Sequence, residues 1–501
     1  MSHPDDRSHR PRESAFPPEY SEFSPPTSAT SSQFPDLPTY SDIFGDPEEQ
    51  VPAGAPPTQH DHILQGGVLK NNKPWVVLHI QTRPSSTPHT VPRLYGSDNV
   101  AGTIDLKLDQ PHIVSSITLV LKGRIITSFT EGGSYPFLEY SHNVWNKSDG
   151  DPRRSSIGKK FDGRLSGDIE FPFSFPFPTE INLESRAVTK GNRASRPPVV
   201  TFTPQTFLER NLKANIEYEL VLTISHGILR TNSKIKAPII FIPRIAPDPP
   251  SEKRQSAYLE GSYLPLPPRD PEGWVALPKV SVTGVFQKQR DVALELTLHL
   301  AYPLCYTRGS VIPCYLVLSS MDSRALELLF NPKMQYVRLA RRIRFFEDPG
   351  KGIEQKLQGK EPNIIEEVDE AEMAVWWVPP KDIPQEDYTK RLEGEIHLAK
   401  DLPPSSDFIP FIIEYAVEIL PFDTHIFKCS NLRRSDHDDD AGSSSKVLLS
   451  HPVTVATLKG SGPSPVPFTK RQRATMSRKR PKRDDVDELG ALRRYGVLTP
   501  L

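Results

Sequence analysis

A proline–tyrosine motif near the start of the chain, Phe16-Pro17-Pro18-Glu19-Tyr20, is the most specific chemical signal in the sequence. Each proline fixes φ near −65°, so two in succession pre-form a polyproline II turn and lower the entropic cost of binding. WW domains bind such PPxY peptides in a groove between aromatic rings. Pro17, Pro18 and Tyr20 therefore indicate a WW-domain ligand.

A second motif of the variant form LPxY follows at Leu37-Pro38-Thr39-Tyr40. Leucine replaces the first proline here, at some loss of pre-organisation. Two motifs on one segment can engage tandem WW domains, and effective concentration then raises avidity by about 10²- to 10⁴-fold over one site. Leu37, Pro38 and Tyr40 are therefore the predicted second contact. The alternative is a chance match, because proline and tyrosine are both frequent in this segment.

Basic residues form a two-part cluster near the end of the sequence. Its members are Lys470, Arg471, Arg473, Arg478, Lys479, Arg480, Lys482 and Arg483. Import receptors read such clusters, and an anionic lipid surface attracts them by about 1 kcal/mol per basic residue. The remaining alternative is a solvated tail, balanced by the acidic residues that follow. The cluster holds no aromatic residue, so a stacking platform for single-stranded nucleic acid is not expected.

Three serines next to paired arginines resemble substrates of basophilic kinases. Ser155 and Ser156 follow one arginine pair, and Ser435 follows another. A phosphate at these positions would add charge beside arginine and could dock or release a partner. Ordinary polar loops are the alternative.

No arrangement of residues predicts catalysis. The sequence has no Walker loop, HExxH, GxSxG or CxxC. We interpret His60-Asp61-His62 as solvated charge in a flexible segment, and Cys305, Cys314 and Cys429 as small apolar residues rather than metal ligands. We therefore expect a non-enzymatic protein without a cofactor or metal.

Composition limits the classes of partner. The 501 residues carry 61 Lys+Arg and 62 Asp+Glu, a formal net charge of −1, which excludes capture of the whole chain by nucleic acid or anionic membrane. The 53 prolines exceed the 28 glycines, and the mean hydropathy is −0.46, so part of the chain is expected to be disordered. The first residues are polar and acidic, unlike a secretory signal, and no apolar run has the length of a membrane span. We expect an intracellular protein.

Alternating apolar and polar residues predict an all-β protein. The clearest example is 215–225, where Ile216, Tyr218 and Leu220 alternate with polar residues. Helical periodicity is expected only at 321–329 and 366–374. Further strands are predicted at 75–81, 100–108, 113–129, 165–171, 199–203, 235–242, 280–286, 292–300, 311–319, 335–346, 374–378, 391–398, 411–420 and 447–457.

A Pro-rich connection at 246–272 divides the body into two similar lengths. We predict a disordered tail at 1–62, β-sandwiches at 63–245 and 273–459, and a second disordered tail at 460–501. The segments 145–163, 347–362 and 433–445 are expected to be mobile insertions. The echo between Ile216-Glu217-Tyr218 and Ile413-Glu414-Tyr415 suggests a duplication.

Several of these segments resemble the arrestin family, in particular the fungal arrestin-related trafficking adaptors (alpha-arrestins). The similar segments keep the family's order along the chain: 94–106, 117–124, 171–178, 215–225 and 236–243, with a looser likeness over 278–457. The resemblance implies two immunoglobulin-like antiparallel β-sandwiches side by side, without a catalytic site.

The resemblance also implies a function. In that family, PPxY motifs recruit HECT-type ubiquitin ligases bearing WW domains, and the sandwiches contact membrane transporters or receptors. We therefore expect an adaptor that promotes ubiquitination and endocytosis of such cargo. It would be cytoplasmic, be recruited to the plasma membrane and endosomes, and bind no nucleic acid. The alternative is a cytosolic or nuclear scaffold without a ligase. The family often carries these motifs after the sandwiches, whereas here they precede them.

Overall fold

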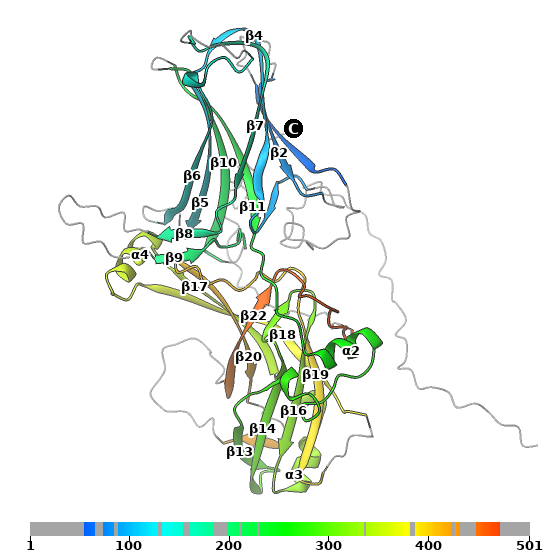
Figure 1. Ribbon diagram of the computed structural model, residues 1–501. Coiled ribbons are helices and arrows are strands. Elements are labelled where there is room, and N and C mark those ends of the chain that lie inside the picture. The colour runs from blue at the N-terminus through cyan, green and yellow to red at the C-terminus, as the bar shows by residue number, and fades with distance from the viewer. Residues whose placement is uncertain are drawn as a thin grey trace, which may run out of the picture. The chain divides into compact units, whose positions relative to one another are not determined.

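The computed structural model describes the chain in twelve stretches, and strands dominate them (Figure 1). All of the described residues belong to one compact unit that starts at Tyr40. The described residues are 55–65, 74–84, 89–128, 133–153, 161–183, 199–209, 212–227, 230–334, 337–380, 386–421, 426–430 and 447–470. The expectation of a mostly β protein is confirmed.

Two sheets pack around a common apolar core in the first half of the described chain, here called the first module. One sheet has the order β1-β2-β4-β7 and the other β3-β11-β10-β5-β6, while β8 and β9 form a separate pair. The strands are β1 (Thr58–Gln65), β2 (Pro74–Thr82), β3 (Arg93–Tyr95), β4 (Asn99–Ile113), β5 (Ser116–Ile126), β6 (Ser134–Asn146), β7 (Arg164–Pro176), β8 (Glu180–Leu183), β9 (Val199–Phe202), β10 (Asn215–Ser225) and β11 (Ser233–Ile242).

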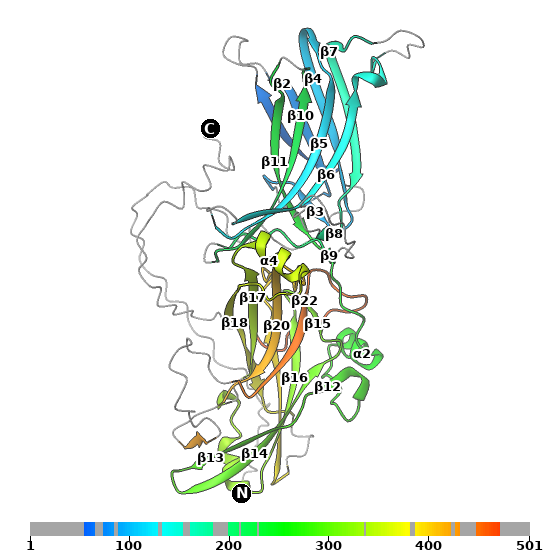
Figure 2. The same cartoon turned by 90° about the vertical axis from the view of Figure 1, so that its left-hand side faces the viewer.

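The second half, here called the second module, forms one large sheet (Figure 2) that folds over on itself through β18. The first part of β18 pairs with β17, and its last four residues pair with β19 in the other layer. The strands are β12 (Trp274–Ala276), β13 (Val280–Phe286), β14 (Arg290–Ala301), β15 (Cys305–Thr307), β16 (Val311–Ser319), β17 (Val337–Phe346), β18 (Ile364–Trp377), β19 (Thr389–His397), β20 (Phe411–Ile419), β21 (Phe427–Cys429) and β22 (Leu449–Ala456).

Both modules use the same strand order. The order β1-β2-β4-β7 corresponds to β13-β14-β16-β19, and β3-β11-β10-β5-β6 corresponds to β15-β22-β20-β17-β18. Every pairing within these two sets is antiparallel except the last one at one edge, where β3 pairs parallel with β11 and β15 parallel with β22. The structure therefore contains a duplicated topology, as the sequence echo suggested.

The duplication extends to side-chain hydrogen bonds. The Tyr218 hydroxyl donates to the carbonyl oxygen of Pro204 at 2.6 Å, and the Tyr415 hydroxyl donates to that of Pro403 at 2.7 Å. Both tyrosines are fully buried, and burial raises the pKa of each phenol above its ordinary value. A buried hydroxyl needs a partner, so each bond fixes the path of the loop that precedes the strand.

Two residues after each proline, a hydroxyl residue ties the same loop to the last strand of its module. The Thr206 hydroxyl accepts from the Phe241 amide at 2.8 Å, and the Ser405 hydroxyl accepts from the Val455 amide at 2.9 Å. In both cases the backbone amide of the hydroxyl residue donates back to the carbonyl oxygen of its partner. The loop and two strands are thus joined identically in each module.

The described residues form the α-helices α2, α3 and α4, of which only α3 was predicted. The helix expected at 321–329 is confirmed as α3 (Ser323–Leu329), which the Asp322 carboxylate caps. The connection at 246–272 contains α2 (Glu252–Glu260), and the expected insertion at 347–362 contains α4 (Pro349–Leu357). Single 3₁₀ turns lie at Lys147–Asp149, Pro271–Gly273 and Pro332–Met334.

The helix expected at 366–374 is wrong, because these residues belong to β18. Their acidic side chains pair with arginines of the neighbouring β17. Arg342 lies 3.3 Å from Glu366, and Arg341 lies 2.6 Å from Asp369. Cross-strand ion pairs of this kind stabilise a strand whose own sequence lacks apolar alternation.

Each of the two terminal segments predicted to be disordered, 1–62 and 460–501, includes residues that belong to the folded body. β1 begins at Thr58, within the segment 1–62 that was expected to be disordered, and His60 is buried there beside Thr82. The interpretation of His60 as solvated charge is therefore wrong. After β22, residues 460–470 are also described, and 468–469 bond to the second module. The expected insertion at 433–445 lies outside the described residues.

We predict that Tyr218→Phe and Tyr415→Phe destabilise the modules that contain them by similar amounts. Each change leaves a buried proline carbonyl without its donor, a loss of about 1–3 kcal/mol. Chemical unfolding of the full chain measures the loss of stability, and hydrogen exchange of β10 and β20 shows in which module the loss occurs. Tyr140→Phe on the half-exposed β6 site is the matched control. Unchanged protection of β10 and β20 would contradict the prediction.

Candidate functional site

Nearly all of the predicted binding residues lie outside the described residues. Of the residues predicted to bind partners or to be phosphorylated, only Lys470 is described, and it is exposed. The others are Pro17, Pro18, Tyr20, Leu37, Pro38, Tyr40, Arg471, Arg473, Arg478, Lys479, Arg480, Lys482, Arg483, Ser155, Ser156 and Ser435. What the structure does define is where the segments carrying the first and last of these residues join the body.

The N-terminal segment joins the body through β1, an edge strand held by a histidine between two carboxylates. His79 on β2 places Nδ1 2.7 Å from an Asp61 oxygen on β1 and Nε2 3.3 Å from an Asp105 oxygen on β4. Burial acts to lower the pKa of His79, but the hydrogen bond and charge of Asp61, with the charge of Asp105, outweigh it and raise the pKa above its ordinary value. The His79 side chain therefore links three strands.

The pKa values of the other histidines near this edge are shifted in the opposite direction to that of His79. Burial lowers the pKa of both His60 and His62, and burial together with Arg93 lowers that of His89. These three imidazoles are therefore harder to protonate than a free histidine. Asp61, in contrast, has a lowered pKa, because its hydrogen bonds to His79 and Gln59 outweigh the effect of its own burial.

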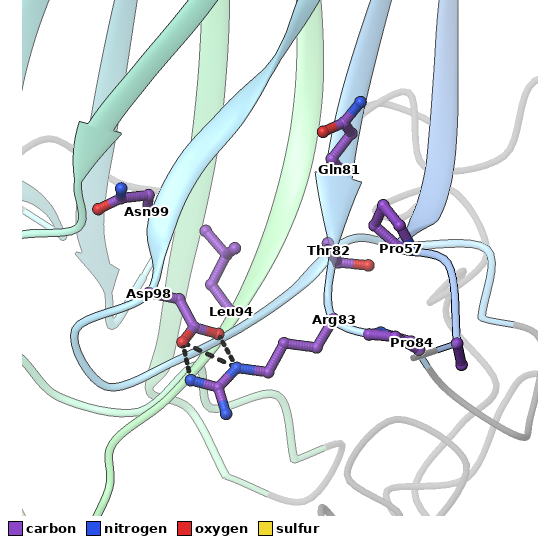
Figure 3. A pocket seen from close by; sticks show the side chains of 9 residues that line it. Pro57, Gln81, Thr82, Arg83, Pro84, Leu94, Asp98 and Asn99 are labelled. Atoms are coloured by element: carbon purple, nitrogen blue, oxygen red, sulfur yellow. Dashed lines mark hydrogen bonds and ion pairs between the residues drawn. The ribbon is translucent and has the colours of Figure 1, made fainter. Parts of the chain in front are cut away.

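A small pocket of about 320 Å³ lies beside the start of β1 (Figure 3). Arg83 reaches across it to Asp98 with a bidentate ion pair, in which Nε lies 2.9 and 3.0 Å from the two carboxylate oxygens. Asp98 also accepts the Tyr95 amide at 3.0 Å, which closes the turn before β4. Both charges are thus engaged by the protein itself, so the pair is suited to holding the turn rather than to acid–base chemistry.

Charged residues also join the two modules. Arg341 on β17 of the second module lies 2.5 Å from Glu209 of the first module and 2.6 Å from Asp369 on β18. Burial acts to lower the pKa of Arg341, but the hydrogen bond and charge of Glu209 outweigh it and hold the pKa above its ordinary value. A guanidinium shared by two carboxylates is planar and multidentate, so it fixes direction as well as distance.

Apolar rings and backbone groups complete the junction. Phe137 meets Phe408 with ring centroids 4.9 Å apart, and Phe207 meets Phe411 at 4.8 Å. The Thr127 hydroxyl donates to the Glu347 carbonyl oxygen at 2.8 Å. The apolar core is consequently continuous from one module to the other.

The C-terminal segment joins the body through residues 463–469, here called the strap. The Glu395 carboxylate on β19 is buried and accepts the amides of Phe468 at 3.0 Å and Thr469 at 2.7 Å. The Thr469 hydroxyl donates to the same carboxylate at 2.5 Å, and His397 Nε2 lies 2.9 Å from that hydroxyl. The Phe468 ring stacks on Trp377 with centroids 4.6 Å apart.

The described residues bring few reactive groups together. Burial raises the pKa of the Cys305 thiol to about 11, and burial places that of Cys314 higher still, so both are thiols near neutral pH. His226 Nε2 lies 2.9 Å from the Ser233 hydroxyl, while its Nδ1 lies 3.2 Å from the Ile113 carbonyl oxygen. This histidine thereby ties the end of β4 to the start of β11. Among the described residues, no three His, Cys, Asp or Glu side chains are grouped to hold a metal ion.

Comparison with models of known protein families and with curated proteins finds no match for this chain. Within the stretches that the structure describes, none of the helices has the length and apolar character needed to cross a bilayer.

Glu209→Gln is expected to loosen the junction. The change removes the charge on the first-module side of Arg341 and costs about 1–2 kcal/mol of stabilisation there. Hydrogen-exchange mass spectrometry should show faster exchange at 203–209 and 337–341. The matched control is Glu219→Gln, which removes an exposed 3.8 Å pair with Lys236 inside one module. Equal exchange in the two variants would show that the ion pair is not holding the junction.

The attachment of β1 is expected to weaken as pH rises. Because the folded pKa of His79 is raised, its stabilisation is fully present below the unfolded value, about 6.5, and is lost as pH rises through the folded pKa. After correction for intrinsic rates, β1 amides should exchange several-fold faster at high than at low pH. His79→Gln should abolish this dependence and leave only the opposite trend of His60 and His62. Exchange of β1 amides that still becomes faster with rising pH in His79→Gln would refute the assignment.

Proposed function

We propose that this protein is a non-enzymatic adaptor of the arrestin type. Its Pro17-Pro18-Glu19-Tyr20 motif recruits a WW-domain ubiquitin ligase of the HECT type, and Leu37-Pro38-Thr39-Tyr40 supplies a second contact. The two modules hold a membrane transporter or receptor as cargo. The result is ubiquitination of the cargo, followed by its endocytosis.

The observation that carries this proposal is the duplicated strand order behind a segment with two proline–tyrosine motifs. In the proposal, each module is an immunoglobulin-like sandwich of the arrestin kind, and the two lie side by side, joined by the contacts of Arg341 and the aromatic pairs. Two rigid modules with a shared core provide a large surface for cargo. The sequence resemblance over 94–243 supports the same family.

The place of the motifs sets the working distance of the ligase. Tyr20 precedes β1 by roughly forty residues, which span at most about 140 Å when fully extended. Because β1 is fastened at His79, the motif segment starts from a fixed point on the first module. A bound ligase could then reach lysines over a wide region of a cargo held by the modules.

The ligase contact predicts a specific loss of binding. In a pull-down of the full chain with purified tandem WW domains, Tyr20→Ala should weaken capture strongly and Tyr40→Ala less. Each single variant loses the avidity of two linked sites, up to about 10²- to 10⁴-fold, and the double variant should lose specific capture altogether. Both tyrosine rings are needed because each fills the pocket beside the proline groove.

Phe23→Ala is the matched control, since it removes an aromatic ring from the same segment outside both motifs. Its binding should equal that of the unaltered chain. If the double tyrosine variant also binds as the unaltered chain does, the recruitment mechanism is wrong, and a scaffold without a ligase becomes the better account.

A further inference from the structure

The first nine residues of β18 have a partner strand on one side only. Residues 364–372, here called the open edge, pair with β17, whereas the ladder between β18 and β19 begins at Ala374. Within the described stretches, no strand lies on the outer side of these residues, and β18 ends the order β15-β22-β20-β17-β18 of its layer (Figure 2). The outer side of such a strand presents backbone N–H and C=O groups that can pair with a further strand.

The open edge is strongly acidic. Five of its nine residues are aspartate or glutamate and none is basic, whereas β6, the corresponding strand of the first module, has one acidic residue in thirteen. Arginines of β17 pair with two of the five, Glu366 and Asp369. One of these arginines, Arg341, is shared with Glu209 of the first module. Two arginines cannot balance five carboxylates, so the acidity is a property of this edge and not of the duplicated fold.

The electrostatics of Glu367 show the effect of this acidity. Burial raises the pKa of Glu367 above its ordinary value, and the charges of Asp369 and Glu209 raise it further. Lys213 and Arg341 act in the opposite direction without outweighing them. Alternate residues of a strand share a face, so Glu367 and Asp369 lie on the same side of β18. An added cation beside them would stabilise the ionised carboxylates.

The other face of the open edge exposes apolar side chains. Ile364 is 44% exposed and Val368 is 48% exposed, and the exposed Glu366 lies between them on the strand. The three side chains form one row, because they are two positions apart along the strand. A strand added to β18 covers part of this row and removes apolar surface from water.

The charge of the open edge selects the kind of strand that fits. A second copy of the chain would place acidic residues opposite acidic residues, and like charges directly opposite each other destabilise a strand pair. Natural edge strands use charged residues to prevent self-pairing in this way. Lysine or arginine opposite the same carboxylates stabilises the pair instead. The open edge therefore disfavours a second copy and fits a basic segment.

We infer that the open edge binds an extended segment of a partner protein that is rich in lysine and arginine and adds to β18 as a further strand. Main-chain hydrogen bonds give this contact its affinity, and the carboxylates together with Ile364 and Val368 give it specificity. The bound segment lies on the side of the second module where Asp369 and Glu209 share Arg341. The site uses neither proline–tyrosine motif and does not rest on the proposed function.

Fluorescence anisotropy of the full chain with a labelled peptide tests this site. The probe has the length of the open edge and, in antiparallel register, places lysine opposite each acidic residue and valine opposite each apolar one. It should bind, and it should slow hydrogen exchange in β18 but not in β6. N-methylation of the probe amides that face β18 keeps the charge but prevents ladder formation, so binding should weaken at least about tenfold. The peptide with glutamate in place of lysine should not bind.

Glu366→Gln with Glu367→Gln should weaken binding of the probe about three- to tenfold, because two opposite-charge pairs across the new ladder are lost. Asp168→Asn with Glu170→Gln is the matched control. It removes two exposed carboxylates from β7, an edge strand of the first module, and changes the net charge by the same amount. This control should bind the probe as the unaltered chain does.

Absence of probe binding would overturn the inference, as would equal weakening in the two pairs of variants or unchanged binding of the N-methylated peptide. A dimer of the unaltered chain in which exchange of β18 is slowed would assign the edge to a second copy and overturn it too. Tighter probe binding after glutamine replaces the seven basic residues from Arg471 to Arg483 would assign the edge to the chain's own basic cluster, with the same consequence. The assay contains no WW domain, so its failure is separable from failure of the pull-down.

Discussion

A buried tyrosine hydroxyl that must find an acceptor is the constraint on which each module depends. Tyr218 and Tyr415 lie in the apolar core, and each bonds to a proline carbonyl in the loop that precedes its strand. That bond sets the loop so that Thr206 or Ser405 can join the last strand of the same module. The last strand in turn accepts a short parallel partner, β3 or β15, at the edge of its sheet. Because these links involve buried or part-buried polar groups, the loss of one leaves its partner without a hydrogen bond.

The sequence predicted strands well where one face is uniformly apolar, and poorly where long-range partners decide. β10, β13 and β16 have the bounds that alternation predicted, since their inward residues are apolar throughout. β6 was missed because two register shifts against β5 interrupt its alternation. The helix predicted at 366–374 from helical periodicity is wrong because that local pattern carries no information about β17, whose arginines pair with the acidic residues of β18. For α2 a local signal did exist, in the capping Ser251 and the terminal Gly261.

The same reasoning explains which site residues the sequence could identify. A PPxY motif can be recognised from the sequence because its four residues are contiguous and because its prolines favour the polyproline II conformation without help from the rest of the fold. The junction between the modules cannot be predicted from the sequence, since Glu209 and Arg341 are separated by 132 positions. Glu395 belongs to the polar side of β19, which alternates with the apolar residues Leu392 and Ile396. It is buried because the strap, 74 positions later, lies over it.

Fastening both ends of the body by buried or half-buried charge has a mechanical consequence. A motif on an unattached tail spreads its local concentration over all positions that the tail can reach, and the useful fraction falls as the linker lengthens. Here the N-terminal segment starts at a strand held through His79, and the C-terminal segment starts at amides held by Glu395. The hydrogen bonds to Glu395 resist removal by about 1–3 kcal/mol, so residues 468–469 stay fixed on the second module. Both segments therefore begin at fixed points on the modules, and the proposed adaptor, which would bring a ligase and a membrane-embedded cargo together, requires such fixed points.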